Sequence, residues 1–182
     1  MNKLTTPRVL VLATVAFVTM TACAATRTQK SAGQGIDDAV IVTQIKSALI
    51  GDPVTRARDI DVEVFKGRVQ LNGFIDSDSE RQRAISLARK VKGVMNVDDN
   101  LKLKGNERRV GEVIDDATLT TKVKAALVAD GRTKAYQISV DTRDSVVLLS
   151  GFVAATASRT AAGEVAAGIS GVKSVDNQIA IK

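Results

Sequence analysis

IDVEVFKGRVQLNG, residues 60–73, alternates apolar and polar residues on both sides of a Lys-Gly pair. The apolar positions before the pair are Ile60, Val62 and Val64, and those after it are Val69 and Leu71. A period of two is typical of a half-buried strand, and a short glycine-containing pair between two such runs is typical of a hairpin. The stretch therefore predicts two antiparallel strands joined by a tight turn.

The same pattern returns as ISVDTRDSVVLLSG, residues 138–151. The constant offset that takes Ile60 to Ile138 also pairs Ile36-Asp37-Asp38-Ala39 with Ile114-Asp115-Asp116-Ala117, and Gly93-Val94 with Gly171-Val172. Agreement in phase over a whole segment indicates an internal duplication. We therefore expect two domains, residues 36–104 and 114–182, joined by a linker at residues 105–113.

Helical patterns flank each hairpin. Asp37 and Asp38 are suited to the start of a first helix, where exposed amides and the helix dipole favour acids. Ile41, Ile45, Ala48 and Leu49 then share one helical face. A second helix leads to Gly93, and a last strand ends near residue 103.

The element order is α-β-β-α-β in both repeats. It predicts the α+β class, with each domain a three-stranded mixed sheet carrying both helices on one face. Domains of this size are marginally stable alone, so packing of the two copies against each other would help. The sequence leaves open whether they do so.

The N-terminal residues have the pattern of an export signal. Lys3 and Arg8 precede an apolar run from Val9 to Val18, which is too short to span a bilayer. Met20-Thr21-Ala22-Cys23 resembles the lipobox of bacterial lipoproteins, which implies a signal peptide at residues 1–22 and lipidation of Cys23. A flexible tether is expected at residues 23–35. The alternative is a secreted soluble protein whose cysteine lies near the cut site by coincidence.

Charge gives no sign of nucleic-acid binding. The chain has 26 basic and 20 acidic residues, and removal of the signal takes away two basic ones, which leaves a net charge of +4. Two of the remaining charges, Arg27 and Lys30, lie in the expected tether. No basic cluster of the kind that a nucleic-acid interface requires is present in the sequence.

Two glycine-containing motifs resemble those of the BON domain, a family named for bacterial osmotically inducible and nodulation proteins. In the first repeat they are residues 69–73, VQLNG, and residues 93–97, GVMNV. In the second repeat they are residues 147–151, VLLSG, and residues 171–177, GVKSVDN. The resemblance covers residues 36–182. With a lipobox in front, the chain resembles the dual-BON lipoproteins of the outer membrane.

The resemblance implies a lipid-anchored protein on the periplasmic face of the outer membrane, with a role in envelope maintenance and binding of anionic phospholipid. It also implies that the first helix of the second domain faces the membrane. The residues expected there are Thr118, Thr121, Lys122, Lys124, Ala125 and Val128. Lysines near a membrane surface attract anionic headgroups. Val40 and Ile50 occupy matching positions in the first repeat and could serve instead.

Nothing in the residue pattern favours catalysis. The chain has no histidine, and its one cysteine is assigned to the lipid. Asp76, Asp78 and Glu80 alternate but lack the spacing and glycine of a calcium loop, so we expect no metal and no cofactor. We interpret Gly73, Gly93, Gly151 and Gly171 as structural, because they follow strands and helices where open φ values favour glycine.

Two functions remain after these exclusions. The first is a non-enzymatic envelope lipoprotein that binds anionic phospholipid and supports outer-membrane integrity or osmotic-stress tolerance. The second is a periplasmic protein-interaction or stabilising module that docks to an envelope assembly.

Overall fold

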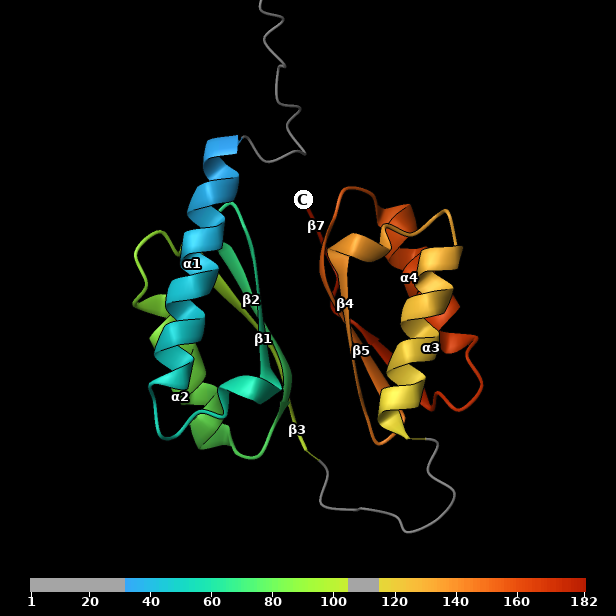
Figure 1. Cartoon of the computed structure of the whole chain (residues 1–182), viewed down its shortest axis with the longest axis horizontal. Coiled ribbons are helices and arrows are strands. Elements are labelled where there is room, and N and C mark those ends of the chain that lie inside the picture. The colour runs from blue at the N-terminus through green and yellow to red at the C-terminus, as the bar shows by residue number, and fades with distance from the viewer. Residues whose placement is uncertain (1–31, 105–114) are drawn as a thin grey trace, which may run out of the picture.

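The computed structural model describes residues 32–104 and 115–182, which form two α-β-β-α-β domains (Figure 1). The first comprises α1 (Ala32–Ile50), β1 (Ile60–Phe65), β2 (Arg68–Ile75), α2 (Asp78–Arg89) and β3 (Asn96–Leu103). The second comprises α3 (Asp116–Ala129), β4 (Ile138–Arg143), β5 (Val146–Val153), α4 (Thr156–Ala167), β6 (Ser174–Asn177) and β7 (Ala180–Ile181). Short 3-10 helices, η1 (Ala57–Asp59) and η2 (Ala135–Gln137), precede β1 and β4. The predicted element order and the α+β class are confirmed.

The hairpin strand lies in the middle of each sheet. β2 pairs antiparallel with β1, where Ile60 lies opposite Gly73, and parallel with β3, where Arg68 lies opposite Asn96. The second domain repeats this arrangement, with Ile138 opposite Gly151 and Val146 opposite Ser174. The sheets are therefore mixed, because the hairpin gives the antiparallel pair and the crossover through α2 or α4 gives the parallel one.

The last strand of the second domain is interrupted, which the three-strand expectation did not include. β6 and β7 both pair with β5 and keep one register, since Leu149 lies opposite Asn177 and Phe152 opposite Ala180. Between them the Asn177 side chain accepts a hydrogen bond from the Ile179 N–H and donates one to the Arg159 carbonyl. The Gln178 N–H still donates to the Leu149 carbonyl of β5 at 2.8 Å, so β6 and β7 are two parts of one edge strand.

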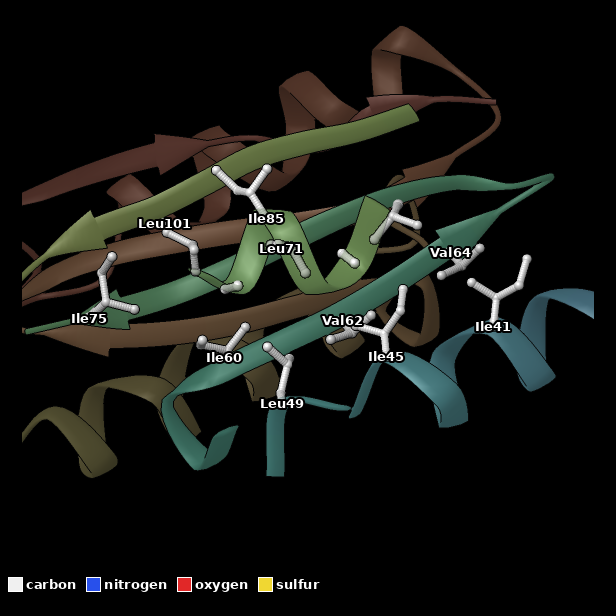
Figure 2. Close-up of a cluster of buried hydrophobic side chains, with 13 residues drawn as sticks. Ile41, Ile45, Leu49, Ile60, Val62, Val64, Leu71, Ile75, Ile85 and Leu101 are labelled. Atoms are coloured by element: carbon white, nitrogen blue, oxygen red, sulfur yellow. The ribbon is translucent and has the colours of Figure 1, made fainter. Parts of the chain in front are cut away.

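The core of each domain lies between its sheet and its two helices. In the first domain Ile45 and Leu49 of α1 are fully buried and lie beside Val62 and Ile60 of β1 (Figure 2). Leu71 and Ile75 of β2 are fully buried in the same cluster. The second domain buries Val123 and Leu127 of α3 in the same way. The alternating apolar residues of the two hairpins are the ones that face the helices.

The two sheets face each other in the centre of the molecule, and the helices lie on the two outer sides (Figure 1). Leu148, Ser150 and Phe152 alternate with the core residues of β5 but are also buried, with 1%, 2% and 6% of their surfaces exposed. They are covered by the first domain, so the chain forms four layers in the order helices, sheet, sheet, helices. Whether the domains pack together was left open by the sequence, and the structure shows that they do.

α1 begins at Ala32, ahead of the start that the acidic pair at residues 37 and 38 predicted. Asp38 is therefore inside the helix, and the expectation that it is a first-turn acid is wrong. The expectation holds in the second domain, where Asp115 precedes α3 and its carboxylate accepts a hydrogen bond from the Ala117 N–H at 3.2 Å. In the described parts of the chain, no helix is both long and apolar enough to cross a bilayer.

Candidate functional site

All six residues expected to face a membrane are exposed on α3. The buried side of this helix is formed by Leu119, Val123 and Leu127, which leaves the opposite side to solvent. Val128 has 74% of its surface exposed although it is aliphatic. An exposed aliphatic residue close to lysines is typical of a helix face that contacts a membrane surface.

The six residues do not form one uniform face. Thr118, Thr121, Ala125 and Val128 lie opposite the buried face of α3, whereas Lys122 and Lys124 lie on its two flanks, one on each side of the buried Val123. The positive charge of Lys124 acts to lower the pKa of Asp141 on β4. Thr121 donates its hydroxyl to the Ala117 carbonyl at 2.9 Å. Both lysines therefore border the outer face of α3.

The first domain also exposes aliphatic residues on its first helix. Val40, near the middle of α1, is 49% exposed, and Ile50, at its C-terminal end, is 74% exposed. Between them Lys46 makes a salt bridge with Asp61 of β1, with 3.6 Å between Nζ and Oδ1. Both domains therefore present candidate membrane-facing helices on the outside of the molecule.

Asp38 and Asp116 have a role that the sequence did not reveal. The Asp38 carboxylate accepts hydrogen bonds from the Lys66 and Gly67 N–H groups at 2.8 and 3.0 Å. Asp116 accepts from the Asp144 and Ser145 N–H groups at 2.9 and 3.0 Å. Each acid ties the first helix to the hairpin turn, and its recurrence at the same place in both repeats was the signal that could have shown this.

The acids considered for calcium binding have structural partners. Glu80 is 2% exposed and accepts hydrogen bonds from the Arg56 and Asp76 N–H groups at 2.7 and 3.0 Å. Asp78 pairs with Arg81 at 3.0 Å. Across the described residues there is no group of three His, Cys, Asp or Glu side chains placed to hold a metal ion.

Gly73 and Gly151 lie inside β2 and β5, not after the strands as expected, where a side chain would collide with backbone. Gly73 has a φ of +127° and Gly151 one of +117°, and a Cβ at either would overlap the carbonyl oxygen of Asp59 or Gln137. Gly93 and Gly171 also have positive φ values, +94° and +100°. Gly93 does not end α2 as expected, because the helix stops at Arg89 and the glycine lies in the turn that follows.

Gln70 joins the two domains through both ends of its side-chain amide. Its Nε2 donates to the Gln178 carbonyl at 3.1 Å, and its Oε1 accepts from the Gly151 N–H at 3.0 Å. Ser139 also donates to Glu63 at 2.6 Å. These bonds cross the space between the sheets, where the sequence pattern alone indicated solvent.

Aromatic and charged contacts add to this interface. The rings of Phe65 and Phe152 lie 5.7 Å apart between centroids, a separation typical of favourable aromatic pairs. Lys102 pairs with Asp176 at 2.7 Å. The interface thus combines a small aromatic contact with polar bonds rather than a continuous apolar surface.

A polar pocket of about 300 Å³ lies between the domains. Its charged lining residues are Arg58, Asp59, Asp61, Lys104, Asp141 and Arg143. Burial raises the pKa of Asp141, the charges of Asp61 and Asp59 raise it further, and Lys124 opposes them. A hydrogen bond from Lys104 lowers the pKa of Asp76, with 2.9 Å between Nζ and Oδ1.

Opposite charges in this pocket are balanced, three acids against three bases. Among the residues that line this pocket, no nucleophile lies beside a base, and the carboxylates are accompanied by an equal number of cations. The lining therefore does not form a recognisable catalytic site. Cys23, the expected lipidation site, lies outside the described residues.

Comparison with known proteins identifies the duplicated unit. The family model of the BON domain matches residues 37–105 and 115–182. Osmotically-inducible protein Y of Escherichia coli is 34% identical over 151 residues, which cover 82% of this chain and 75% of that protein. Outer membrane lipoprotein DolP of Haemophilus influenzae is 31% identical over 147 residues, 80% of this chain and 75% of that protein.

Among solved structures, the C-terminal domain of CdsD, a structural protein of the type III secretion system of Chlamydia trachomatis, matches with 13% identity and a TM-score of 0.33. The match covers 80% of this chain and 67% of that chain, and it is too distant to inform on function. The family match spans both of the repeated domains described above. The chain therefore belongs to the BON-domain family, with two BON domains in tandem.

Proposed function

We propose that this protein is a non-enzymatic envelope lipoprotein, anchored through Cys23 on the periplasmic face of the outer membrane, that binds anionic phospholipid. In this role it supports outer-membrane integrity or osmotic-stress tolerance. The observation that carries the proposal is the combination of two BON domains with a lipobox, in a chain that resembles an outer-membrane lipoprotein over 80% of its length. The relative named for osmotic induction supports the stress role.

The outer face of α3 supports a lipid contact. Lys122 and Val128 are both exposed, and Lys124 lies at the edge of the same helix. A single acyl chain gives only marginal membrane binding, with a constant of about 10⁴ M⁻¹, so a second contact matters for a singly acylated protein. A lipoprotein with several chains is already held, and the helix contact would then set its orientation.

Vesicle binding tests the proposal. The chain from residue 23 to residue 182, carrying Cys23→Ser to prevent acylation, should sediment with phosphatidylglycerol vesicles and not with phosphatidylcholine vesicles. Binding should fall steeply between low and physiological salt, because exposed charges are screened beyond about 8 Å at 0.15 M. Lys122→Glu with Lys124→Glu should weaken binding without changing the melting temperature.

A different result would favour the second function, a protein-interaction module. Binding that is insensitive to salt, or no binding to anionic vesicles by the parent protein, would contradict the lipid proposal.

The anchor is tested separately in cells. Cys23→Ala should abolish incorporation of labelled fatty acid and leave the signal peptide uncut, since the thiol is the group acylated. Alanine at residue 24 in place of an inner-membrane retention Asp implies outer-membrane delivery, which membrane fractionation checks. Labelled fatty acid on the Cys23→Ala protein, or recovery of the parent in the inner membrane, would contradict this assignment.

A further inference from the structure

A groove of about 420 Å³ lies beside α1 in the first domain. Three segments meet there: the outer side of α1, the turn between β1 and β2, and the loop after α2. The residues that matter for its chemistry are Val40, Lys66, Gly67, Lys92, Gly93 and Met95. Met95 is 83% exposed and Val40 is 49% exposed, so two apolar side chains face solvent. Of the two lysines beside them, Lys92 is exposed, and Lys66 is half-buried with its Nζ 5.4 Å from the centre of the Phe65 ring.

Two glycines keep the floor of this groove open. Gly67 and Gly93 have φ values of +75° and +94°. A Cβ on Gly67 would meet the Gly93 carbonyl oxygen and the Met95 side chain, so a larger residue would close the groove here. The loop is held in place by the Met95 N–H, which donates to the Gly67 carbonyl at 2.8 Å.

The second domain has the same backbone arrangement with different side chains. There the Lys173 N–H donates to the Ser145 carbonyl at 2.8 Å, as Met95 donates to Gly67. At the matching positions of the second repeat, Val40 becomes Thr118, Met95 becomes Lys173, Lys66 becomes Asp144 and Lys92 becomes Ser170. The combination of exposed apolar side chains with two lysines is therefore found in the first domain and not at the matching positions of the second. Because both domains have the same fold, the fold itself does not require this combination.

We propose that the groove of the first domain is a second membrane contact, which receives the surface of an anionic phospholipid bilayer. Lys66 and Lys92 would meet the phosphates while Val40 and Met95 enter the interfacial layer. The inference rests on the proposed function and adds to it a site on the other domain.

The acidic residue in the groove does not oppose this assignment. Asp38 is 3% exposed, and its carboxylate accepts the Lys66 and Gly67 N–H groups inside the turn. Its charge is therefore directed into the turn, while Lys92 and Met95 are exposed at the rim.

The position of the groove along the chain also favours a bilayer. α1 begins at Ala32, nine residues after Cys23. Nine residues span at most about 30 Å when fully extended. A lipid on Cys23 would consequently keep the first domain close to the membrane surface, with the groove on the helix that the anchor leads into.

Charge reversal in matched pairs tests the site. In the chain from residue 23 carrying Cys23→Ser, Lys66→Glu with Lys92→Glu should weaken binding to phosphatidylglycerol vesicles by about thirtyfold or more, since each lysine near an anionic surface contributes about fivefold. Lys122→Glu with Lys124→Glu changes the net charge equally and should weaken binding less. Thermal unfolding of both variants checks that they fold.

The outcomes separate this inference from the proposed function. Unchanged binding by the groove variant, with or without a loss in the α3 variant, would overturn the groove and leave lipid binding in place. No binding by the parent protein would overturn both.

A probe of the apolar residues gives an independent test. Cys23→Ser removes the only cysteine, so Met95→Cys, Ile50→Cys and Val128→Cys can each carry one environment-sensitive fluorophore. On anionic vesicles the label at residue 95 should shift to the blue, whereas the label at residue 50, 74% exposed at the far end of α1, should not. A shift at residue 128 without one at residue 95 would overturn the groove.

Discussion

Asp38 and Asp116 are the residues that hold each first helix to its hairpin. Both carboxylates accept two consecutive backbone N–H groups of the turn, at 2.8–3.0 Å. Charge-assisted bonds of this kind are about twice as strong as neutral ones. They also let the turn keep residues at positive φ, such as Lys66 at +51° and Asp144 at +51°.

Gly73 and Gly151 are expected to tolerate no side chain. Gly73→Val and Gly151→Val should each destabilise one domain by about 2–4 kcal/mol, because positive φ is strained for valine and its Cβ overlaps a backbone carbonyl. Thermal unfolding measures this loss. Gly131→Val is the control, since no atom lies within 4 Å of a Cβ there. A melting temperature equal to the parent's in both glycine variants would contradict the assigned role.

Asp141 should make stability depend on pH in a direction opposite to most acids. Its pKa is raised above 3.8 in the folded state by burial and by Asp61, so the folded protein holds this proton more tightly than the unfolded chain. The free energy of unfolding contributed by this group therefore falls as pH rises above 3.8.

Asp141→Asn removes that penalty. The variant should melt higher than the parent at pH 7, and the difference should shrink as pH approaches 3.8. Asp144→Asn, at an exposed acid of the adjacent turn, should show no such pH-dependent gain. An Asp141→Asn effect that is the same at both pH values would contradict the electrostatic cause.

At the scale of the elements, a threonine that follows each first helix donates a hydrogen bond to a backbone carbonyl near the C-terminus of that helix. Thr55 donates its hydroxyl to the Leu49 carbonyl at 2.5 Å, and Thr133 donates to the Leu127 carbonyl at the same distance. Both threonines are buried. A free carbonyl at a helix C-terminus needs such a partner when water is excluded.

Thr55→Val and Thr133→Val should each cost about 1–3 kcal/mol, since valine keeps the shape and removes the hydroxyl donor. In Thr55→Val the Leu49 carbonyl keeps only the longer bond from the Asp52 N–H at 3.3 Å. Denaturant unfolding measures the loss. Thr43→Val is the control, because Thr43 bonds the Ala39 carbonyl from an exposed position. Equal stability of the Thr55 and control variants would show that the bond contributes nothing.

At the scale of the whole molecule, the two sheets pack together through a small number of polar bonds. Gln70 is 2% exposed and contacts the backbone of the second domain at Gly151 and Gln178. The Gly151 N–H can donate toward Gln70 in the other domain because the positive φ of Gly151 departs from ordinary strand geometry. Gln70 therefore couples the first domain to two backbone positions of the second.

Gln70→Ala should loosen that coupling. We expect a loss of about 1–3 kcal/mol and a thermal transition that separates into two, because two buried backbone groups lose their partner. Calorimetry distinguishes one transition from two. Gln82→Ala, on the exposed side of α2, should melt like the parent. A single unshifted transition for Gln70→Ala would mean that the domains pack without this residue.

Sequence patterns were sufficient for the element order and for the core of each domain. Alternation around Ile60 and Ile138, and helical spacing from Ile41, report local periodicity, which depends only on residues a few positions apart. The repeat of the whole pattern at a constant offset then indicated two similar domains. The exposed positions of α3 followed from the same helical spacing, because the buried face of a helix also defines its opposite face.

The packing of the sheets, the domain-joining role of Gln70 and the groove beside α1 were decided only by the tertiary structure. Gln70, Ser150 and Phe152 occupy the face of their strands that faces away from the domain core, where sequence patterns indicate solvent. The groove forms where α1, a hairpin turn and a later loop meet, so its residues are as far apart in the chain as Val40 and Met95. Periodicity carries no information about contacts of that separation, because they depend on how completed elements pack.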